Sequence, residues 1–315
     1  MNFLRMIRRN KIVNGVFRKI LKKSSALSVQ IHSFLIHRWP PSGNLDCNFG
    51  PYQFKYFNQC DDGLALYFYY GLPYPEKADL NLFLELSKKS KCIVDIGANT
   101  GLFSVLASKV NPKSNIYAFE PYSINAERMN MNLRLNSANN VTVYEFAIGD
   151  KDGEIQISIP KNKSITDVSS VNQGFSKKIY PEIVWESQVV PLTTLDSFAL
   201  ENKITIDLIK CDVETFEMSV FKGAERILTE DKPTILFECF LDDERKLFFN
   251  NVLRKHNYYV YLMLEQGVVY IQEGFVNASY GLNYLITPVK PTKTFINYQN
   301  IEDLWKGLLL RSTAD

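Results

Sequence analysis

The sequence of 315 residues has few of the features that mark membrane-spanning or disulfide-rich proteins. In its N-terminal region the longest stretch without a charged residue, positions 24–37, has 14 residues, whereas a membrane-spanning helix needs about 20 apolar residues. The five cysteines are an odd number, and no two of them form a C-x-x-C pair. Cys92, Cys211 and Cys239 fall in apolar runs typical of buried strands. We therefore expect free thiols and a cytoplasmic protein rather than a disulfide scaffold.

Acidic residues are absent from positions 1–40, which contain nine of the 36 lysines and arginines. The rest of the chain holds 27 basic and 34 acidic residues. The chain is thus a mildly acidic body with a cationic N-terminal arm. An acidic body argues against a broad nucleic-acid-binding surface, so we expect no nucleic-acid partner.

The cationic arm carries apolar residues at roughly helical spacing, with the cations between them. This pattern predicts a basic amphipathic helical arm over residues 1–43. Such a helix can lie on an anionic membrane surface, so peripheral membrane contact through residues 1–40 is one interpretation. A helix packed on the body or on a partner, and an unstructured start, are the alternatives. The run Pro40-Pro41-Ser42-Gly43 separates the arm from the body.

From residue 91 onward, apolar runs of strand length alternate with helical patterns. Strands are expected at 91–96, 115–119, 141–148 (extended by a hairpin at 154–159), 205–211 and 234–238, and helices at 102–110, 124–135, 216–228 and 243–256. This alternation predicts an α/β fold with a mainly parallel central sheet and helices on both faces.

The flanking regions extend this body on both sides. Residues 44–90 are rich in aromatics and predict short strands or a hairpin, followed by a helix at 76–89. Later runs predict antiparallel strands at 260–264, 268–271 and 283–286, and a closing helix at 301–310. The insert at 160–186 is either a lid or an ordinary surface loop. We therefore divide the chain into an arm (1–43), an aromatic-rich segment (44–90) and a main domain (91–315).

The segment Val94-Asp95-Ile96-Gly97-Ala98-Asn99-Thr100-Gly101 follows a predicted strand and opens a helix. Its glycines allow a tight turn and the close approach of a ligand, and a helix N-terminus favours an anionic group. Ligands of open α/β sheets bind at the carboxyl ends of the strands. The spacing is not G-x-G-x-x-G, which disfavours a standard dinucleotide-binding fold and a nicotinamide-dependent oxidoreductase.

Glu120, in Ala118-Phe119-Glu120-Pro121, ends the next strand. An acidic residue at this place can accept hydrogen bonds from both hydroxyls of a ribose. The alternative is a charge that favours a helix N-terminus. Taken with the glycine turn, Glu120 predicts a pocket for a nucleoside with a small carboxylate-bearing tail.

A third group of polar residues, Lys210, Asp212, Glu214 and Glu217, lies at the end of a later strand. Lys210 and Asp212 share a strand face, and Glu214 and Glu217 share a face if the helix has begun. Clustered carboxylates repel, which can raise one pKa towards that of a general base. They could instead bind a divalent cation or be acids favoured by a helix dipole. We expect no metal at the site.

These segments together resemble the FkbM family of S-adenosylmethionine-dependent methyltransferases, which have the class I Rossmann-like fold. The resemblance covers about residues 90–240 and is carried, in order, by D-I-G-A-N-T-G at 95–101, F-E-P at 119–121, T-L-D at 194–196, I-K-C-D-V-E at 209–214, E-M-S-V-F-K-G-A at 217–224 and F-E at 237–238. It implies that the cofactor S-adenosyl-L-methionine is bound by Asp95, Gly97, Ala98, Asn99, Gly101, Glu120, Ala147, Ile148 and Asp212, with Gly149 beside the adenine as well.

The resemblance also implies O-methylation of a hydroxyl on a sugar, polysaccharide or glycosylated metabolite, so the expected partner is a glycan or small-molecule acceptor. Histidine is the usual first candidate for the base, but only His32, His37 and His256 are present. We therefore predict a carboxylate base, Glu214 or Glu217, with Asp212 mainly orienting the cofactor.

One residue departs from the family's pattern. The family usually has glycine after D-V-E, where this chain has Thr215. This departure motivates the alternative of a catalytically silent cofactor-binding or scaffold protein.

Overall fold

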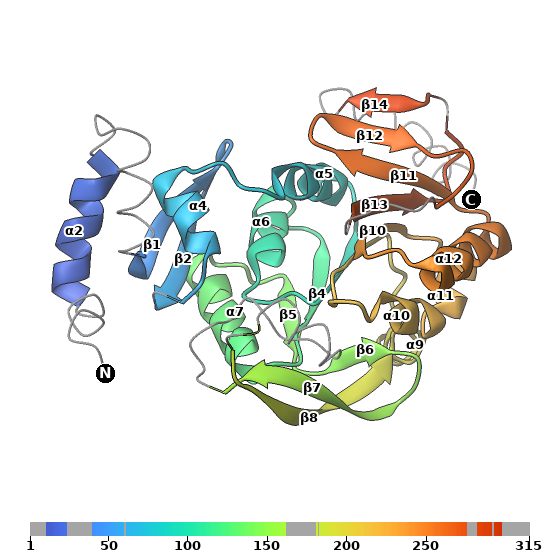
Figure 1. Cartoon of the computed structure of the whole chain (residues 1–315), viewed down its shortest axis with the longest axis horizontal. Helices are drawn as coiled ribbons and strands as arrows, with labels where there is room; N and C mark the ends of the chain where they lie inside the picture. The colour runs from blue at the N-terminus through green and yellow to red at the C-terminus, as the bar shows by residue number, and fades with distance from the viewer. Residues whose placement is uncertain are drawn as a thin grey trace.

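The computed structural model describes residues 11–23, 40–59, 61–161, 181, 183–275, 282–291 and 293–297 (Figure 1). The predicted helix at 301–310, most of the insert at 160–186 and parts of the N-terminal arm lie outside these residues. Within them, no helix has both the length and the apolar character needed to cross a membrane.

The central sheet has nine strands in the order β14-β12-β11-β13-β10-β9-β3-β4-β5. Its parallel half consists of β3 (Cys92–Ile96), β4 (Asn115–Phe119), β5 (Val141–Tyr144), β9 (Leu208–Cys211) and β10 (Thr234–Cys239). Its antiparallel half consists of β11 (Tyr259–Leu264), β12 (Gly267–Tyr270), β13 (Leu282–Thr287) and β14 (Phe295–Asn297). The chain runs outward from β3 to β5 and then returns to β9 on the other side of β3. This reversal is the place where open α/β sheets bind ligands.

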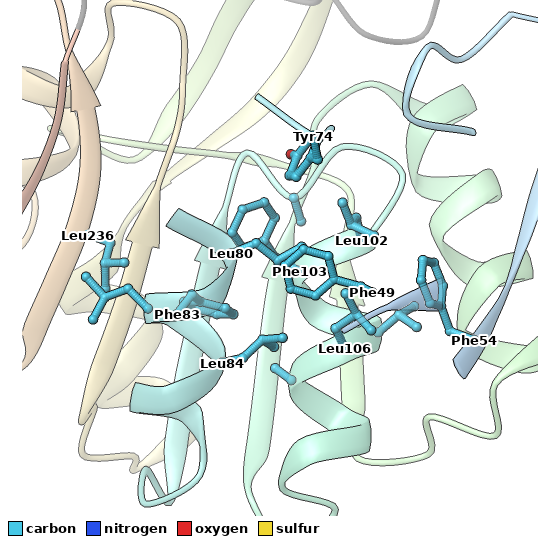
Figure 2. Close-up of a cluster of buried hydrophobic side chains, with 14 of the residues drawn as sticks. Phe49, Phe54, Tyr74, Leu80, Phe83, Leu84, Leu102, Phe103, Leu106 and Leu236 are labelled. Carbon is cyan, nitrogen blue, oxygen red and sulfur yellow. The ribbon is translucent and has the colours of Figure 1, made fainter. Parts of the chain in front are cut away.

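Helices cover both faces of this sheet because its parallel strands are apolar on both faces. Neighbouring residues of β3 belong to the cores on opposite faces of the sheet. Ile93 packs on one side with the helices α5 (Lys77–Ser87), α6 (Leu102–Val110) and α7 (Ser123–Leu135). Val94 packs on the other side with α9 (Leu195–Asn202), α10 (Glu217–Lys222), α11 (Glu225–Thr229) and α12 (Asp243–His256). Figure 2 shows the first core, where Phe83 of α5 meets Phe103 of α6 at a ring-centroid distance of 5.4 Å.

The N-terminal elements add to the first core. The antiparallel hairpin of β1 (Ser42–Phe49) and β2 (Tyr52–Gln59) contributes Phe49 and Phe54 to it (Figure 2). The helix α4 (Leu64–Tyr70) follows the hairpin, and the helix α2 (Lys11–Lys23) contacts β1. A separate three-stranded sheet is formed by β6 (Ala147–Gly149), β7 (Gly153–Pro160) and β8 (Trp185–Thr194).

Several elements differ from the sequence-based expectation. The strand expected at 141–148 is two strands, β5 and β6, which belong to different sheets. The chain breaks between them because the ring of Phe146 packs in an aromatic cluster with Phe119 and Tyr144. The expected hairpin partner at 154–159 pairs with β8 instead of extending β5. The helix expected at 216–228 breaks after α10, where Gly223 passes so close to β6 that an added Cβ would lie 1.9 Å from the carbonyl oxygen of Gly149.

Candidate active site

A cavity of about 450 Å³ opens at the carboxyl ends of the parallel strands. Its walls come from the loops that follow β3, β4 and β9, from β6 and β10, and from the region around α4. Its lining residues include Tyr67, Tyr74, Glu76, Gly97, Ala98, Asn99, Glu120, Ala147, Ile148, Lys210, Asp212, Glu214 and Glu238. The structure thus brings most of the residues predicted from the sequence to one cavity. Asp95, Gly101, Gly149 and Glu217 are not among its lining residues.

The loop after β3 is anchored to β4. The backbone N–H groups of Gly97 and Ala98 both donate to the carbonyl oxygen of Phe119, each at 3.0 Å. Gly97 has φ +75°, and a Cβ there would lie 1.8 Å from the backbone oxygen of Asp212. Only glycine therefore allows the loops after β3 and β9 to approach each other this closely.

Glu120 joins the loop after β3 to the start of α7. Its side chain is 3% exposed, and its two carboxylate oxygens accept hydrogen bonds from the backbone N–H groups of Asn99 and Tyr122, both at 2.9 Å. Burial raises the pKa of Glu120 to about 7, although these two hydrogen bonds act in the opposite direction. The adjacent Oδ1 of Asn99 is buried and has no hydrogen-bond partner among the described residues. The site therefore presents two acceptors to a ligand with several donors.

Lys210 is the basic residue among the described residues that line the cavity. Its Nζ lies 3.1 Å from Oδ2 of Asp212 and 4.0 Å from Oδ1 of the fully buried Asp95, and it stands 4.6 Å from the centre of the Phe103 ring. Burial alone would lower the pKa of Lys210, but the carboxylates of Asp212 and Asp95 raise it above its ordinary value. Asp95 also accepts a hydrogen bond from Ser104. Asp95 is thus buried beneath the loop, close to Lys210 but outside the cavity lining, and its contact with the cofactor stays a prediction.

Three glutamates line the cavity beside Asp212. Burial first, and repulsion from Asp212 second, raise the pKa of Glu214 and of Glu238 to about 8. The same causes raise the pKa of Glu76, which accepts a hydrogen bond from the Tyr74 hydroxyl at 2.7 Å. A carboxylate with a pKa near the working pH is suited to accept a proton from a substrate.

Glu217 occupies a different place from Glu214. It is the first residue of α10, is 2% exposed, and its Oε1 accepts a hydrogen bond from the backbone N–H of Thr215 at 3.0 Å. The helix has not begun at Glu214, because Glu214 and Thr215 have φ of +50° and +77°. The condition under which Glu214 and Glu217 would share a helix face is therefore not met, and Glu217 supports the turn that presents Glu214 to the cavity.

Sequence reasoning assigned no role to four of these lining residues. Glu238 belongs to the F-E pair of the quoted motifs, and its position at the end of a parallel strand could have marked it. Tyr67, Tyr74 and Glu76 come from the segment before the main domain. No pattern in the sequence indicates that this segment reaches the carboxyl edge of the sheet.

The order of the central strands, with the cavity at the reversal beside β3, is that of the class I Rossmann-like methyltransferases. The family model of the methyltransferase FkbM domain matches residues 95–263, and the chain belongs to this family. The resemblance seen in the motifs is thereby confirmed, because the matched region is a methyltransferase FkbM domain.

Among the similar proteins, Methyltransferase 1 of Beauveria bassiana is 28% identical over 145 residues, covering 42% of this chain and 58% of that protein. The 2-O-methyltransferase NoeI of Sinorhizobium fredii is 29% identical over 169 residues, covering 50% and 67%. The chain thus spans less than two thirds of the first of these relatives. The crystal structure of methyltransferase FkbM from Methylobacillus flagellatus is 18% identical with a TM-score of 0.41, covering 62% of this chain and 43% of that one.

The cofactor of this class is S-adenosylmethionine, and the residues present fit it. Glu120 can accept hydrogen bonds from the ribose hydroxyls, and the partnerless Oδ1 of Asn99 can accept one from an ammonium group. Ala147 and Ile148 add an apolar wall where a flat base can lie. When bound, the cofactor supplies an electrophilic methyl group on a sulfonium sulfur.

Proposed function

We propose that the protein transfers a methyl group to a hydroxyl of a sugar, a polysaccharide or a glycosylated metabolite. The observation that carries the proposal is the composition of one cavity. Asn99 and Glu120 come from the loops after β3 and β4, whereas Asp212 and Glu214 follow β9 and Glu238 belongs to β10, next to β9. The first pair suits a nucleoside with an amino-acid tail, and the second group suits a neutral hydroxyl acceptor that must lose a proton.

In this proposal Glu214 or Glu238 takes the proton of the acceptor hydroxyl. Both line the cavity, and burial keeps both pKa values at about 8. Asp212, paired with Lys210 at 3.1 Å, orients the methionine end of the cofactor. Alignment of the hydroxyl with the methyl group contributes most of the acceleration, since proximity can lower a barrier by about 7–11 kcal/mol.

The wall around α4 favours a sugar as the acceptor. The rings of Tyr67 and Tyr74 lie 5.6 Å apart, both line the cavity, and Tyr74 hydrogen-bonds Glu76. Aromatic rings beside carboxylates offer an apolar surface and hydrogen-bond acceptors together, as a sugar ring requires. The name of the relative NoeI, a 2-O-methyltransferase, also supports transfer to oxygen. A cytoplasmic location belongs to this proposal, since the described cysteines are buried and free.

The test is transfer of a labelled methyl group from S-adenosylmethionine to carbohydrate and lipid-linked glycan pools. Once an acceptor is identified, the kcat of Glu214→Gln and of Glu238→Gln is compared with that of Glu201→Gln, an exposed control on α9. The variant that lacks the base should lose about 10²–10⁴-fold in kcat, because general-base catalysis contributes that much. Full activity of both variants would disprove the assignment of the base.

A catalytically silent cofactor-binding or scaffold protein is the second candidate, favoured by the left-handed backbone of the non-glycine residue Thr215 at the edge of the site. It predicts binding of S-adenosylmethionine without methylation of any acceptor pool. One methylated acceptor would eliminate it.

A further inference from the structure

The helix α2 is fixed to the body by one face. Asn14 is 1% exposed, donates from Nδ2 to the carbonyl oxygen of Pro40 at 3.0 Å, and accepts at Oδ1 from the backbone N–H of Ser42 at 3.2 Å. Leu21, seven residues further on, is 5% exposed. Residues seven apart lie on the same side of a helix, so Asn14 and Leu21 mark the face of α2 that is turned to the protein.

The opposite face of α2 carries an exposed apolar stripe. Ile12, Val16 and Ile20 are 80%, 53% and 58% exposed. Their spacing of four residues places them on one side of the helix, and the helical period of 3.6 residues places that side away from Asn14 and Leu21. Single exposed apolar side chains are ordinary on a protein surface, whereas three in one stripe mark a contact surface.

The charge of α2 identifies the partner. The helix contains five basic residues and no acidic one, and residues 1–40 hold nine basic residues and no acidic one. Lys19, which is exposed, lies three residues from Val16 and thus borders the stripe. An apolar stripe bordered by cations complements a lipid surface with negative headgroups. A second copy of the same helix would bring like charges together.

We propose that α2 binds the surface of an anionic lipid bilayer by inserting the Ile12–Val16–Ile20 stripe between the headgroups. This binding site is separate from the cavity and does not depend on which acceptor is methylated. It would hold the enzyme at a membrane while the body, anchored through Asn14, stays outside the bilayer.

The experiment measures co-sedimentation of the full chain with vesicles of phosphatidylcholine alone or mixed with phosphatidylserine. The variant Ile12→Ser/Val16→Ser/Ile20→Ser removes the stripe. The control Val184→Ser/Val189→Ser/Leu200→Ser removes three apolar side chains of similar exposure elsewhere on the body, at 59%, 54% and 60%. All six are exposed, so both variants should fold, which their thermal unfolding will verify.

We expect wild type and the control to bind the mixed vesicles, and the stripe variant to bind at least about tenfold more weakly, since each inserted side chain contributes by its buried apolar area. Lys19→Glu and added salt should each weaken the binding of the wild-type stripe to the mixed vesicles, because both reduce the attraction between the cations of α2 and the negative headgroups. Equal binding by the stripe variant and wild type would overturn the proposal. So would equal binding of wild type to neutral and mixed vesicles, or self-association of the chain without vesicle binding.

Discussion

The substitution Glu217→Gln tests whether the buried carboxylate of Glu217 supports the turn before α10 or acts as the catalytic base. Glu217 is 2% exposed, its Oε1 accepts the Thr215 N–H, and its Oε2 has no hydrogen-bond partner among the described residues. Glutamine keeps an oxygen for Thr215 and removes the titrating proton. The variant should therefore change the pH dependence of stability rather than the chemistry.

The magnitude follows from the pKa of Glu217. Burial, reinforced by repulsion from Asp212, raises this pKa from 4.5 to about 7 despite the hydrogen bonds that lower it. The contribution of Glu217 to the free energy of unfolding is thus fully present below pH 4.5 and is lost as the pH rises through about 7. The cause is that Glu217 ionises at a lower pH in the unfolded chain than in the folded protein. One pKa unit is worth about 1.4 kcal/mol, so the loss through this residue is about 3 kcal/mol at high pH.

Urea unfolding of wild type and Glu217→Gln at about pH 5 and about pH 8 measures this difference. The variant should gain about 2–3 kcal/mol relative to wild type between the two pH values, since only the wild type ionises there. The same relative stability at both pH values would show that folding does not raise the pKa of Glu217. The variant should also keep near wild-type kcat. A loss of about 10²-fold or more in kcat, with cofactor affinity unchanged, would restore Glu217 as the base.

Three further substitutions test the surroundings of the cavity. Gly97→Ala places a Cβ 1.8 Å from the Asp212 carbonyl oxygen and should abolish detectable S-adenosylmethionine binding in calorimetry, whereas unchanged affinity would show that the two loops separate at little cost. Thr215→Gly relieves a φ of +77° and should raise stability by about 0.5–1 kcal/mol, which is a rise in Tm of about 1–2 °C; a lower Tm would show that the side chain is needed in the turn. Tyr56→Phe removes the hydroxyl that bridges Asp62 and Thr100, which lies in the loop after β3. The substitution should lower the free energy of unfolding in urea by about 1–3 kcal/mol. An unchanged free energy of unfolding would mean that Asp62 finds another donor.

Most of the parallel half of the fold could be predicted because β3, β4 and β9 are short, mainly apolar runs that are followed directly by glycine or an acidic residue. The helix expected at 102–110 is α6 with the same bounds, and β3 and β4 lie within one residue of their expected ranges. The helix α4 was missed because its tyrosines and phenylalanine are typical of strands. The breaks at Phe146 and Gly223 depend on tertiary packing, which no local pattern records.

The site shows the same division. The sequence alone predicts that Glu120, Asp212 and Glu214 lie close together, because the carboxyl ends of parallel strands meet at one edge of the sheet. Tyr74 and Glu76 could not, since they reach this edge from a segment that precedes the first parallel strand. Glu217 was predicted beside Glu214 as a candidate base, but the left-handed backbone at Glu214 and Thr215 separates the two, and Glu217 does not line the cavity.

We expect this cavity to bind S-adenosylmethionine, with Glu120 holding the ribose. Calorimetric titration of wild type, Glu120→Ala and the exposed control Glu201→Ala at about pH 8, above the pKa of Glu120 of about 7, tests this binding. Wild type and control should bind with micromolar affinity, and Glu120→Ala about 10- to 100-fold more weakly, the loss expected for hydrogen bonds to a charged group. No binding by wild type would show that the cavity is not a cofactor site, and equal binding by Glu120→Ala would show that Glu120 does not hold the ribose.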